Sequence, residues 1–182
     1  MQMRFNPFNP QGLIAPGMFC GRQEELAAIE RCLAQTRHGN PQHFLFHGER
    51  GIGKSSLLLY VEALAHDEDV AGQEYNFLCV PVDLANCATQ LDILRAIGTG
   101  FKDALNLRSK LKARCGKFWD WLTNWEILGV RYHKHPEEYD AQEAALELVG
   151  NLATLCENAA KDLDGILLLI DEADRPDERA GL

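Results

Sequence analysis

The sequence contains no long hydrophobic run and no export signal. Its longest apolar stretch, residues 165–170, is far shorter than the roughly 20 residues that a helix needs to span a bilayer. The first residues, Met1 to Pro7, lack the apolar region of a secretory signal. These two absences predict a cytoplasmic protein that has no membrane partner.

Paired-cysteine motifs are also missing. The six cysteines never occur with the C-x-x-C spacing of zinc or redox sites, and most lie within apolar patterns. They are Cys20, Cys32, Cys79, Cys87, Cys115 and Cys156. We therefore interpret them as reduced packing residues, and not as disulfide or metal-binding residues.

Positive charge is scarce overall but concentrated in one segment. The chain has 18 basic and 27 acidic residues, a net charge of −9, which argues against a surface that binds nucleic acid as a whole. Residues 101–135 nevertheless carry an excess of basic side chains: Lys102, Arg108, Lys110, Lys112, Arg114, Lys117, Arg131 and Lys134. With Trp119, Trp121 and Trp125, this segment is either a partner surface, where single-stranded DNA could stack, or a solvated helix face with core tryptophans.

Hydrophobic periodicity predicts helices that alternate with strands. Helices are expected at residues 23–36, 54–65 and 91–101, and strands at residues 43–47, 77–82 and 166–170. This alternation implies an α/β fold with a parallel sheet flanked by helices. Residues 1–17 contain three prolines and are expected to form an extended arm, which leaves residues 18–182 for the domain.

The part between residues 102 and 140 fits this alternation poorly, and we treat it as an insert. Its apolar residues Leu107, Leu111, Cys115 and Phe118 predict a basic amphipathic helix. Trp125, Ile127 and Tyr132 suggest a strand or hairpin. A further helical stripe follows the insert and is interpreted as a core-facing surface, because it is too short for a coiled coil; it consists of Ala145, Leu148, Leu152, Leu155 and Ala159.

A glycine-rich loop separates the predicted strand at residues 43–47 from the predicted helix at 54–65. It reads Gly48-x-x-x-x-Gly53-Lys54-Ser55 and matches the phosphate-binding loop at every fixed position. Such a loop points successive backbone amides at a polyphosphate, at the positive end of a helix dipole. The candidate nucleotide-binding residues are Gly48, Glu49, Arg50, Gly51, Ile52, Gly53, Lys54, Ser55 and Ser56. Lys54 is expected to reach the β- and γ-phosphates, and the Ser55 hydroxyl to coordinate Mg²⁺.

Two carboxylates end the apolar strand predicted at residues 166–170. A continuous apolar strand is expected to be buried on both faces in the middle of a parallel sheet. Ligands of such sheets bind at the carboxyl ends of the strands. The glycine-rich loop and the acid pair each follow a predicted strand, so both are expected at that edge. Asp171 is therefore the candidate metal residue, and Glu172 the residue that orients and polarises the attacking water.

These motifs together resemble those of AAA+ and STAND-type P-loop ATPases. Residues 48–55 are similar to a Walker A motif, and residues 166–172 to a Walker B motif. Residues 19–26, FCGRQEEL, resemble the F-x-G-R-x-x-E-L segment that precedes the loop in this family. In that family the segment lies beside the adenine, so the resemblance implies that Phe19, Gly21 and Arg22 contact the base. It covers about residues 18–175, apart from the insert.

The resemblance implies bound ATP or ADP with Mg²⁺ and leaves two functions open. One is an ATPase that acts on a protein or nucleic-acid partner, with Glu172 and Lys54 as its catalytic residues. The other is a nucleotide-dependent switch with little hydrolysis. Asp171-Glu172-Ala173-Asp174 also matches the DEAD-box helicase signature, but the other helicase motifs are not apparent, and neither are the acceptor site and lid of a kinase.

The resemblance also implies parts that follow Walker B in this family. These are a fourth strand, a polar sensor residue, an arginine finger and a helical lid, and the sequence shows none of them after Glu172. We therefore expect a sheet that is incomplete toward its C-terminal side, poor hydrolysis by this chain alone, and a tendency to form homo-oligomers.

Overall fold

The computed structural model describes residues 21–65, 75–125 and 140–175. These residues form two compact units, Met1–Tyr75 and Asn76–Leu182, and each is described by itself. The expected N-terminal arm at residues 1–17, the base contact of Phe19 and the hairpin suggested by Ile127 and Tyr132 lie outside the described residues. The fold is of the α/β class, and the described residues contain helices and an incomplete parallel sheet of two strands.

The first unit contains helices α1 (Gln23–Arg37) and α2 (Lys54–Ala65), close to the predicted bounds. Helix α1 follows two residues with positive φ, Gly21 at 86° and Arg22 at 54°. Of the three apolar residues that helical periodicity predicts on one face, Ile29 and Leu33 are buried and Leu26 is half-buried. The carboxylate of Glu30 acts on the phenol of Tyr60 in α2, whose pKa is raised first by burial and then by this charge.

The strand predicted at residues 43–47 is not formed. Phe44 and Phe46 lie on one side with ring centroids 5.2 Å apart, whereas Leu45 points away and is 83% exposed. The side chains therefore alternate as in a strand, but the only ladder among the described residues joins two strands of the second unit. The prediction failed because a short apolar run favours an extended, buried segment but does not supply a hydrogen-bonding partner.

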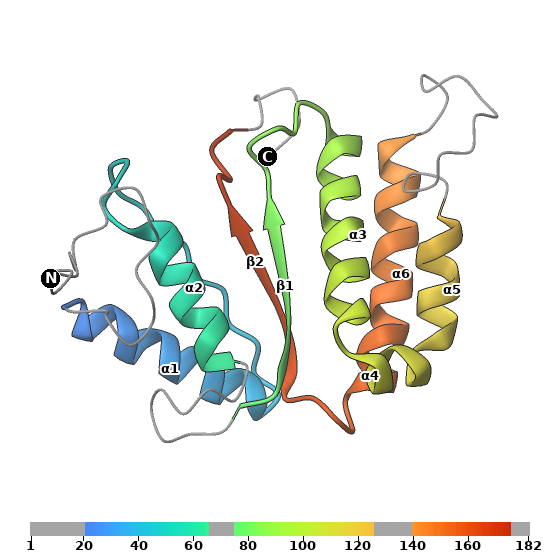
Figure 1. Ribbon diagram of the computed structural model, residues 1–182, viewed down its shortest axis with the longest axis horizontal. Coiled ribbons are helices and arrows are strands. Elements are labelled where there is room, and N and C mark those ends of the chain that lie inside the picture. The colour runs from blue at the N-terminus through green and yellow to red at the C-terminus, as the bar shows by residue number, and fades with distance from the viewer. Residues whose placement is uncertain (1–20, 66–74, 126–139, 176–182) are drawn as a thin grey trace, which may run out of the picture. The chain divides into compact units, whose positions relative to one another are not determined.

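The sheet of the second unit pairs β1 (Phe77–Asp83) with β2 (Gly165–Asp171) in parallel (Figure 1). The register runs from Phe77 opposite Gly165 to Asp83 opposite Asp171, so both strands end at the same edge. Strand β1 is buried apart from Pro81 and Asp83, as its apolar run predicts. Strand β2 is not, because Leu168 and Ile170 are 40% and 38% exposed. The expectation of burial on both faces was wrong, since β2 has β1 as its only strand neighbour among the described residues.

Helix α3 (Gln90–Asn106) packs directly on β1. It begins with a capping box, in which the Thr89 hydroxyl accepts from the amide of Asp92 and the Asp92 carboxylate accepts from the amide of Thr89. Gly100 allows the close approach of helix and strand, because a Cβ there would lie 2.7 Å from the carbonyl oxygen of Pro81.

The insert begins as helix and is packed into the second unit. Two short helices, α4 (Ser109–Arg114) and α5 (Gly116–Asn124), replace the single helix predicted from Leu107 to Phe118. The chain leaves α3 at Leu107, which is 88% exposed instead of buried, while Leu111, Cys115 and Phe118 are buried as expected. A change of direction between helices breaks the phase of the apolar pattern, which is why a continuous helix was the wrong prediction.

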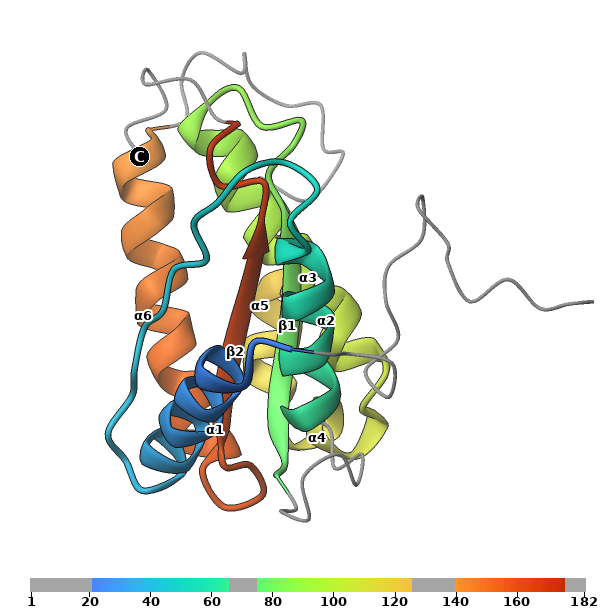
Figure 2. The ribbon, with the colours of Figure 1, turned by 90° about the vertical axis from the view of Figure 1, so that its left-hand side faces the viewer.

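Helix α6 (Ala141–Ala159) completes the helical layer beside α3 and α5, as Figures 1 and 2 show. It buries Leu148, Leu155 and Ala159 as predicted, and also Ala144, whereas Ala145 and Leu152 of the predicted stripe are only half-buried. These helices and the facing side of β1 enclose the core of the unit, which includes Leu78, Val80, Val82, Phe101, Leu105, Phe118 and Leu122. Among the described residues, no helix combines the length and apolarity required to cross a membrane.

Candidate functional site

The phosphate-loop residues 48–53 connect the extended segment of the first unit to α2. Gly51 and Gly53 have φ angles of 84° and 94°, in the region that favours glycine, so two of the loop glycines are required by the backbone. The loop folds closely on itself, because a Cβ on Gly48 would lie only 3.2 Å from Cγ2 of Ile52. The Ile52 amide also donates to the carbonyl oxygen of Glu49 at 3.4 Å.

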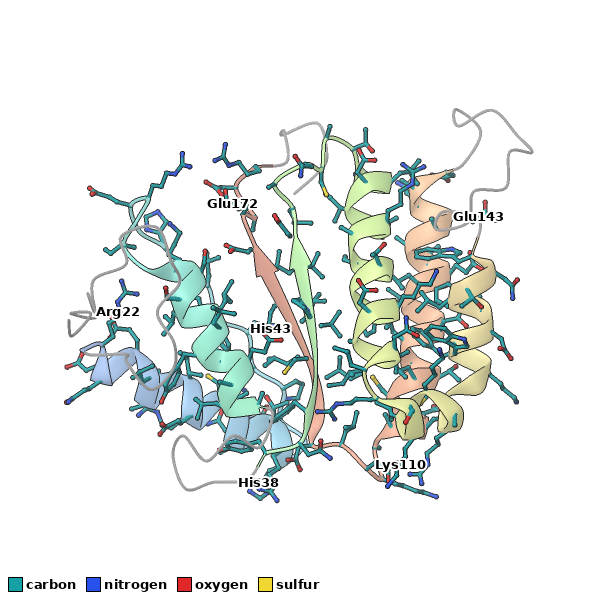
Figure 3. All side chains as sticks on the ribbon, viewed as in Figure 1. Arg22, His38, His43, Lys110, Glu143 and Glu172 are labelled. Carbon is teal, nitrogen blue, oxygen red and sulfur yellow. The ribbon has the colours of Figure 1, made fainter. Side chains whose placement is uncertain are left out.

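Cationic side chains contact the carbonyl groups of this loop. Nζ of Lys54 donates to the carbonyl oxygen of Gly48 at 3.0 Å and to that of Glu49 at 3.2 Å. The guanidinium of Arg22, labelled in Figure 3, donates to the carbonyl oxygen of Ile52. The upstream segment therefore contacts the phosphate loop, and two of its predicted site residues, Arg22 and Gly21, belong to the same unit as the loop.

The first turn of α2 offers its amides to an anion. The first four N–H groups of a helix have no acceptor within the helix, and they carry the positive end of its dipole. The first turn contains Lys54, Ser55 and Ser56 and no acidic residue, so no carboxylate of this turn competes for those amides. Ser55 is half-buried and Ser56 is buried, so of the two hydroxyls that of Ser55 is the more accessible.

The second predicted motif lies at the carboxyl end of β2, in the second unit. Asp171 is the last residue of the strand, and its Oδ1 accepts a hydrogen bond from the amide of Glu172 at 2.9 Å. Glu172 has a φ of 54°, unusual for a residue with a side chain, and Figure 3 shows it at the end of β2. The chain therefore turns sharply as it leaves the sheet, at the residue that was predicted to orient and polarise the attacking water.

Two neighbours of these carboxylates were not identified from the sequence. Asp83 ends β1 opposite Asp171, and the amide that follows it, that of Leu84, donates to the Asp171 carbonyl oxygen at 3.1 Å. Arg175 donates from Nε to Oε2 of Glu172 at 2.8 Å, and this contact raises the pKa of Arg175. The matched strand ends could have indicated Asp83, but no sequence pattern indicated the ion pair of Glu172 with Arg175.

Each unit contains an oxygen donor of the kind that Mg²⁺ prefers. Asp171 supplies a carboxylate and Ser55 a hydroxyl, both hard ligands of the kind that Mg²⁺ prefers. The described residues contain no cluster of three or more histidine, cysteine or acidic side chains that could hold a metal by themselves. Magnesium sites of nucleotide-binding proteins need only one or two carboxylates, because phosphate and water complete the shell.

The three tryptophans of the insert are engaged within the second unit. The Glu147 carboxylate of α6 accepts from Nε1 of Trp121 at 2.7 Å and from Nε1 of Trp125 at 3.0 Å. Nζ of Lys112 lies 3.5 Å from the ring centroid of Trp119. Trp125 is buried and the other two are half-buried. These contacts favour the interpretation as core tryptophans over a surface for base stacking.

Several basic residues of the insert are likewise tied to the second unit. Arg108 donates to Oδ1 of Asn76 at 2.8 Å, and Arg114 forms an ion pair with Asp162. Asn76 precedes β1, and its own amide donates to Asp164 before β2 at 2.8 Å. These contacts join α4 to the starting ends of the strands, the opposite end of the sheet from Asp171. Part of the basic charge therefore stabilises the fold.

Comparison with known proteins identifies the family. Neither the curated proteins nor the solved structures give a match. The family model described as "AAA ATPase domain" matches residues 18–180, which include the loop, the acid pair and the insert. The chain therefore belongs to the AAA ATPase domain family.

Proposed function

We propose that this chain binds ATP or ADP together with Mg²⁺ through residues 48–56. The observation that carries the proposal is the loop itself, with Gly51 and Gly53 in the conformations it requires and α2 starting at Lys54 without an acidic residue in its first turn. A nucleotide polyphosphate supplies the negative charge that such amides and Lys54 favour. Lys54 exchanges its contacts with two loop carbonyls for contacts with the phosphates.

Asp171 and Ser55 are the proposed magnesium residues, and Glu172 is the proposed base. Mg²⁺ would neutralise charge on the phosphates and orient them, while the Glu172 carboxylate accepts a proton from the attacking water. The base contacts implied for Phe19 and Gly21 remain part of this proposal. Arg22 is a different case, because its guanidinium contacts the loop.

A switch with little hydrolysis is the second candidate function, and one observation favours it. The Glu172 carboxylate is paired with Arg175 through Oε2 at 2.8 Å, so an attacking water must compete with a guanidinium for this oxygen. A protein or nucleic-acid partner, or a second copy of the chain, would then respond to the bound nucleotide more than to turnover.

Ligand-dependent stability tests the proposal on the chain as it exists. A ligand that binds only the folded state raises the free energy of unfolding, by about 2.7 kcal/mol at a hundred times its Kd. We expect ATP with Mg²⁺ to raise the thermal midpoint of the wild type and of Lys110→Ala, which changes an exposed lysine of α4. Lys54→Ala should show little or no shift at the same concentration. Equal shifts for Lys54→Ala and wild type would contradict a site at this loop.

A further inference from the structure

Arg22 contacts the phosphate loop from outside the motif. It lies thirty residues before Ile52 in the chain, yet its guanidinium donates to the Ile52 carbonyl oxygen. The residue caps the start of α1 with a φ of 54°, directly after Gly21 at 86°. This turn sets the direction in which the Arg22 side chain leaves the helix. The contact is therefore built on the backbone geometry of the upstream segment.

A contact to one carbonyl fixes the direction of the next amide. The peptide unit is planar and trans, so the carbonyl of Ile52 and the N–H of Gly53 belong to one rigid group and point in opposite directions. Holding the Ile52 carbonyl toward Arg22 therefore turns the Gly53 amide away from Arg22. Lys54 acts in the same way on the carbonyls of Gly48 and Glu49, and so on the amides that follow them.

The loop needs these side-chain contacts because its own backbone forms few hydrogen bonds that would fix its conformation. Gly51 and Gly53 adopt conformations that cost a glycine nothing, but glycine also leaves the chain free to take others. Within residues 48–53, the backbone contact that the structure describes is the long one of 3.4 Å from the Ile52 amide to the Glu49 carbonyl oxygen. A nucleotide would displace Lys54 from its carbonyls, whereas Arg22 contacts a different carbonyl and can remain.

We infer that Arg22 is a positioning residue of the phosphate loop, which orients the Gly53 amide toward the polyphosphate of the nucleotide. The inference rests on the proposed function for the identity of the ligand. It differs from a base contact in what it predicts, because orientation of the loop serves every polyphosphate equally, whatever base is attached.

Three ligands separate the two roles of Arg22. Calorimetric titration with ATP, GTP and inorganic tripolyphosphate, each with Mg²⁺, is carried out on wild type, Arg22→Ala and Arg22→Lys. Arg31→Ala is the matched control, because it removes one exposed arginine from the same helix. We expect Arg22→Ala to weaken all three ligands by a similar factor, about ten-fold for a lost hydrogen bond from a charged donor. Arg22→Lys should recover part of the loss.

Loss of ATP affinity with unchanged tripolyphosphate affinity would overturn the inference in favour of a base contact. Unchanged affinity for all three ligands would overturn it as well. A wild type that binds none of the ligands would contradict the proposed function, and a second arm then still decides the role of Arg22. In that arm, hydrogen exchange of the amides at residues 49–54 is measured without ligand. Exchange should be faster in Arg22→Ala than in wild type and Arg31→Ala, and equal rates would overturn the inference.

Discussion

Replacing Glu147 by alanine should loosen the insert from the rest of the second unit. The Glu147 carboxylate accepts hydrogen bonds from the indole N–H groups of both Trp121 and Trp125, so the substitution removes the acceptor of two donors. Trp121 is half-buried, and water can replace the lost acceptor at little cost. Trp125 is 2% exposed, and its N–H group would stay in the protein without a partner.

The size of the effect follows from these two exposures. An unsatisfied buried donor costs about 1–3 kcal/mol, while the exposed contact contributes a few tenths of a kcal/mol after screening by solvent. We expect Glu147→Ala to lower the free energy of unfolding by about 2 kcal/mol. For a chain of this length, that corresponds to a decrease of roughly 4–8 °C in the thermal midpoint.

Tryptophan fluorescence during urea unfolding measures this directly, because all three tryptophans of the chain lie in the insert. Glu157→Ala is the matched control, since it removes an exposed carboxylate from the same helix. Its midpoint should stay close to that of the wild type. A Glu147→Ala variant that unfolds at the wild-type urea concentration would refute the reasoning, and would reopen the interpretation of these tryptophans as a stacking surface.

Two further predictions concern the helix–strand contact and the acid pair. Gly100→Ala should destabilise the chain by about 1–3 kcal/mol, because the added Cβ meets the backbone carbonyl of Pro81. Gly150→Ala in α6 should stabilise it by about 0.5–1 kcal/mol, because a Cβ there meets nothing within 4 Å and alanine favours a helix over glycine. Urea unfolding in which both variants change the free energy of unfolding in the same direction would contradict this packing. Glu172→Gln should keep nucleotide affinity and lower any hydrolysis, whereas Asp171→Asn should weaken the dependence of binding on Mg²⁺. Identical behaviour of these two variants in titrations and phosphate-release assays would show that their roles are not divided in this way.

The local elements of the fold were largely predictable from the sequence. Helix α2 has the predicted bounds, and β1 and β2 lie within one residue of theirs, because each has a continuous pattern with clear signals at its ends. The loop preceding α2 was recognised for the same reason. Gly53 is a fixed glycine of this motif, and its φ angle of 94° is a backbone geometry that few other residues allow.

Features that depend on contacts between residues distant in the sequence were not predictable. The apolar residues 43–47 looked like a strand, but pairing requires a second strand that no local pattern supplies. Leu107 fitted a helical stripe, yet the helix direction changes there and leaves it exposed. No sequence pattern indicated a role for Glu147, which became visible only when α5 placed two indole groups beside this residue of α6.

The same holds for the candidate site: its motif residues were predictable from the sequence, and the residues that contact them were not. Lys54, Asp171 and Glu172 were proposed as site residues from spacing alone, because each of these motif positions carries a fixed chemical task in the family that the sequence resembles. Their immediate partners were not, since Arg22 reaches Ile52 across thirty residues and Arg175 pairs with Glu172 through a turn that requires a positive φ. The motifs therefore supplied the candidate residues, and the structure was needed to show their contacts.

Direct titration of the chain with ATP and Mg²⁺ in a calorimeter tests the central claim. The account predicts one nucleotide per chain for wild type, with affinity lost in Lys54→Ala although that variant remains folded by circular dichroism. It also predicts weaker binding when Mg²⁺ is removed by a chelator. Absence of heat and of binding for folded wild type, or equal affinity for wild type and Lys54→Ala, would contradict a nucleotide site at residues 48–56.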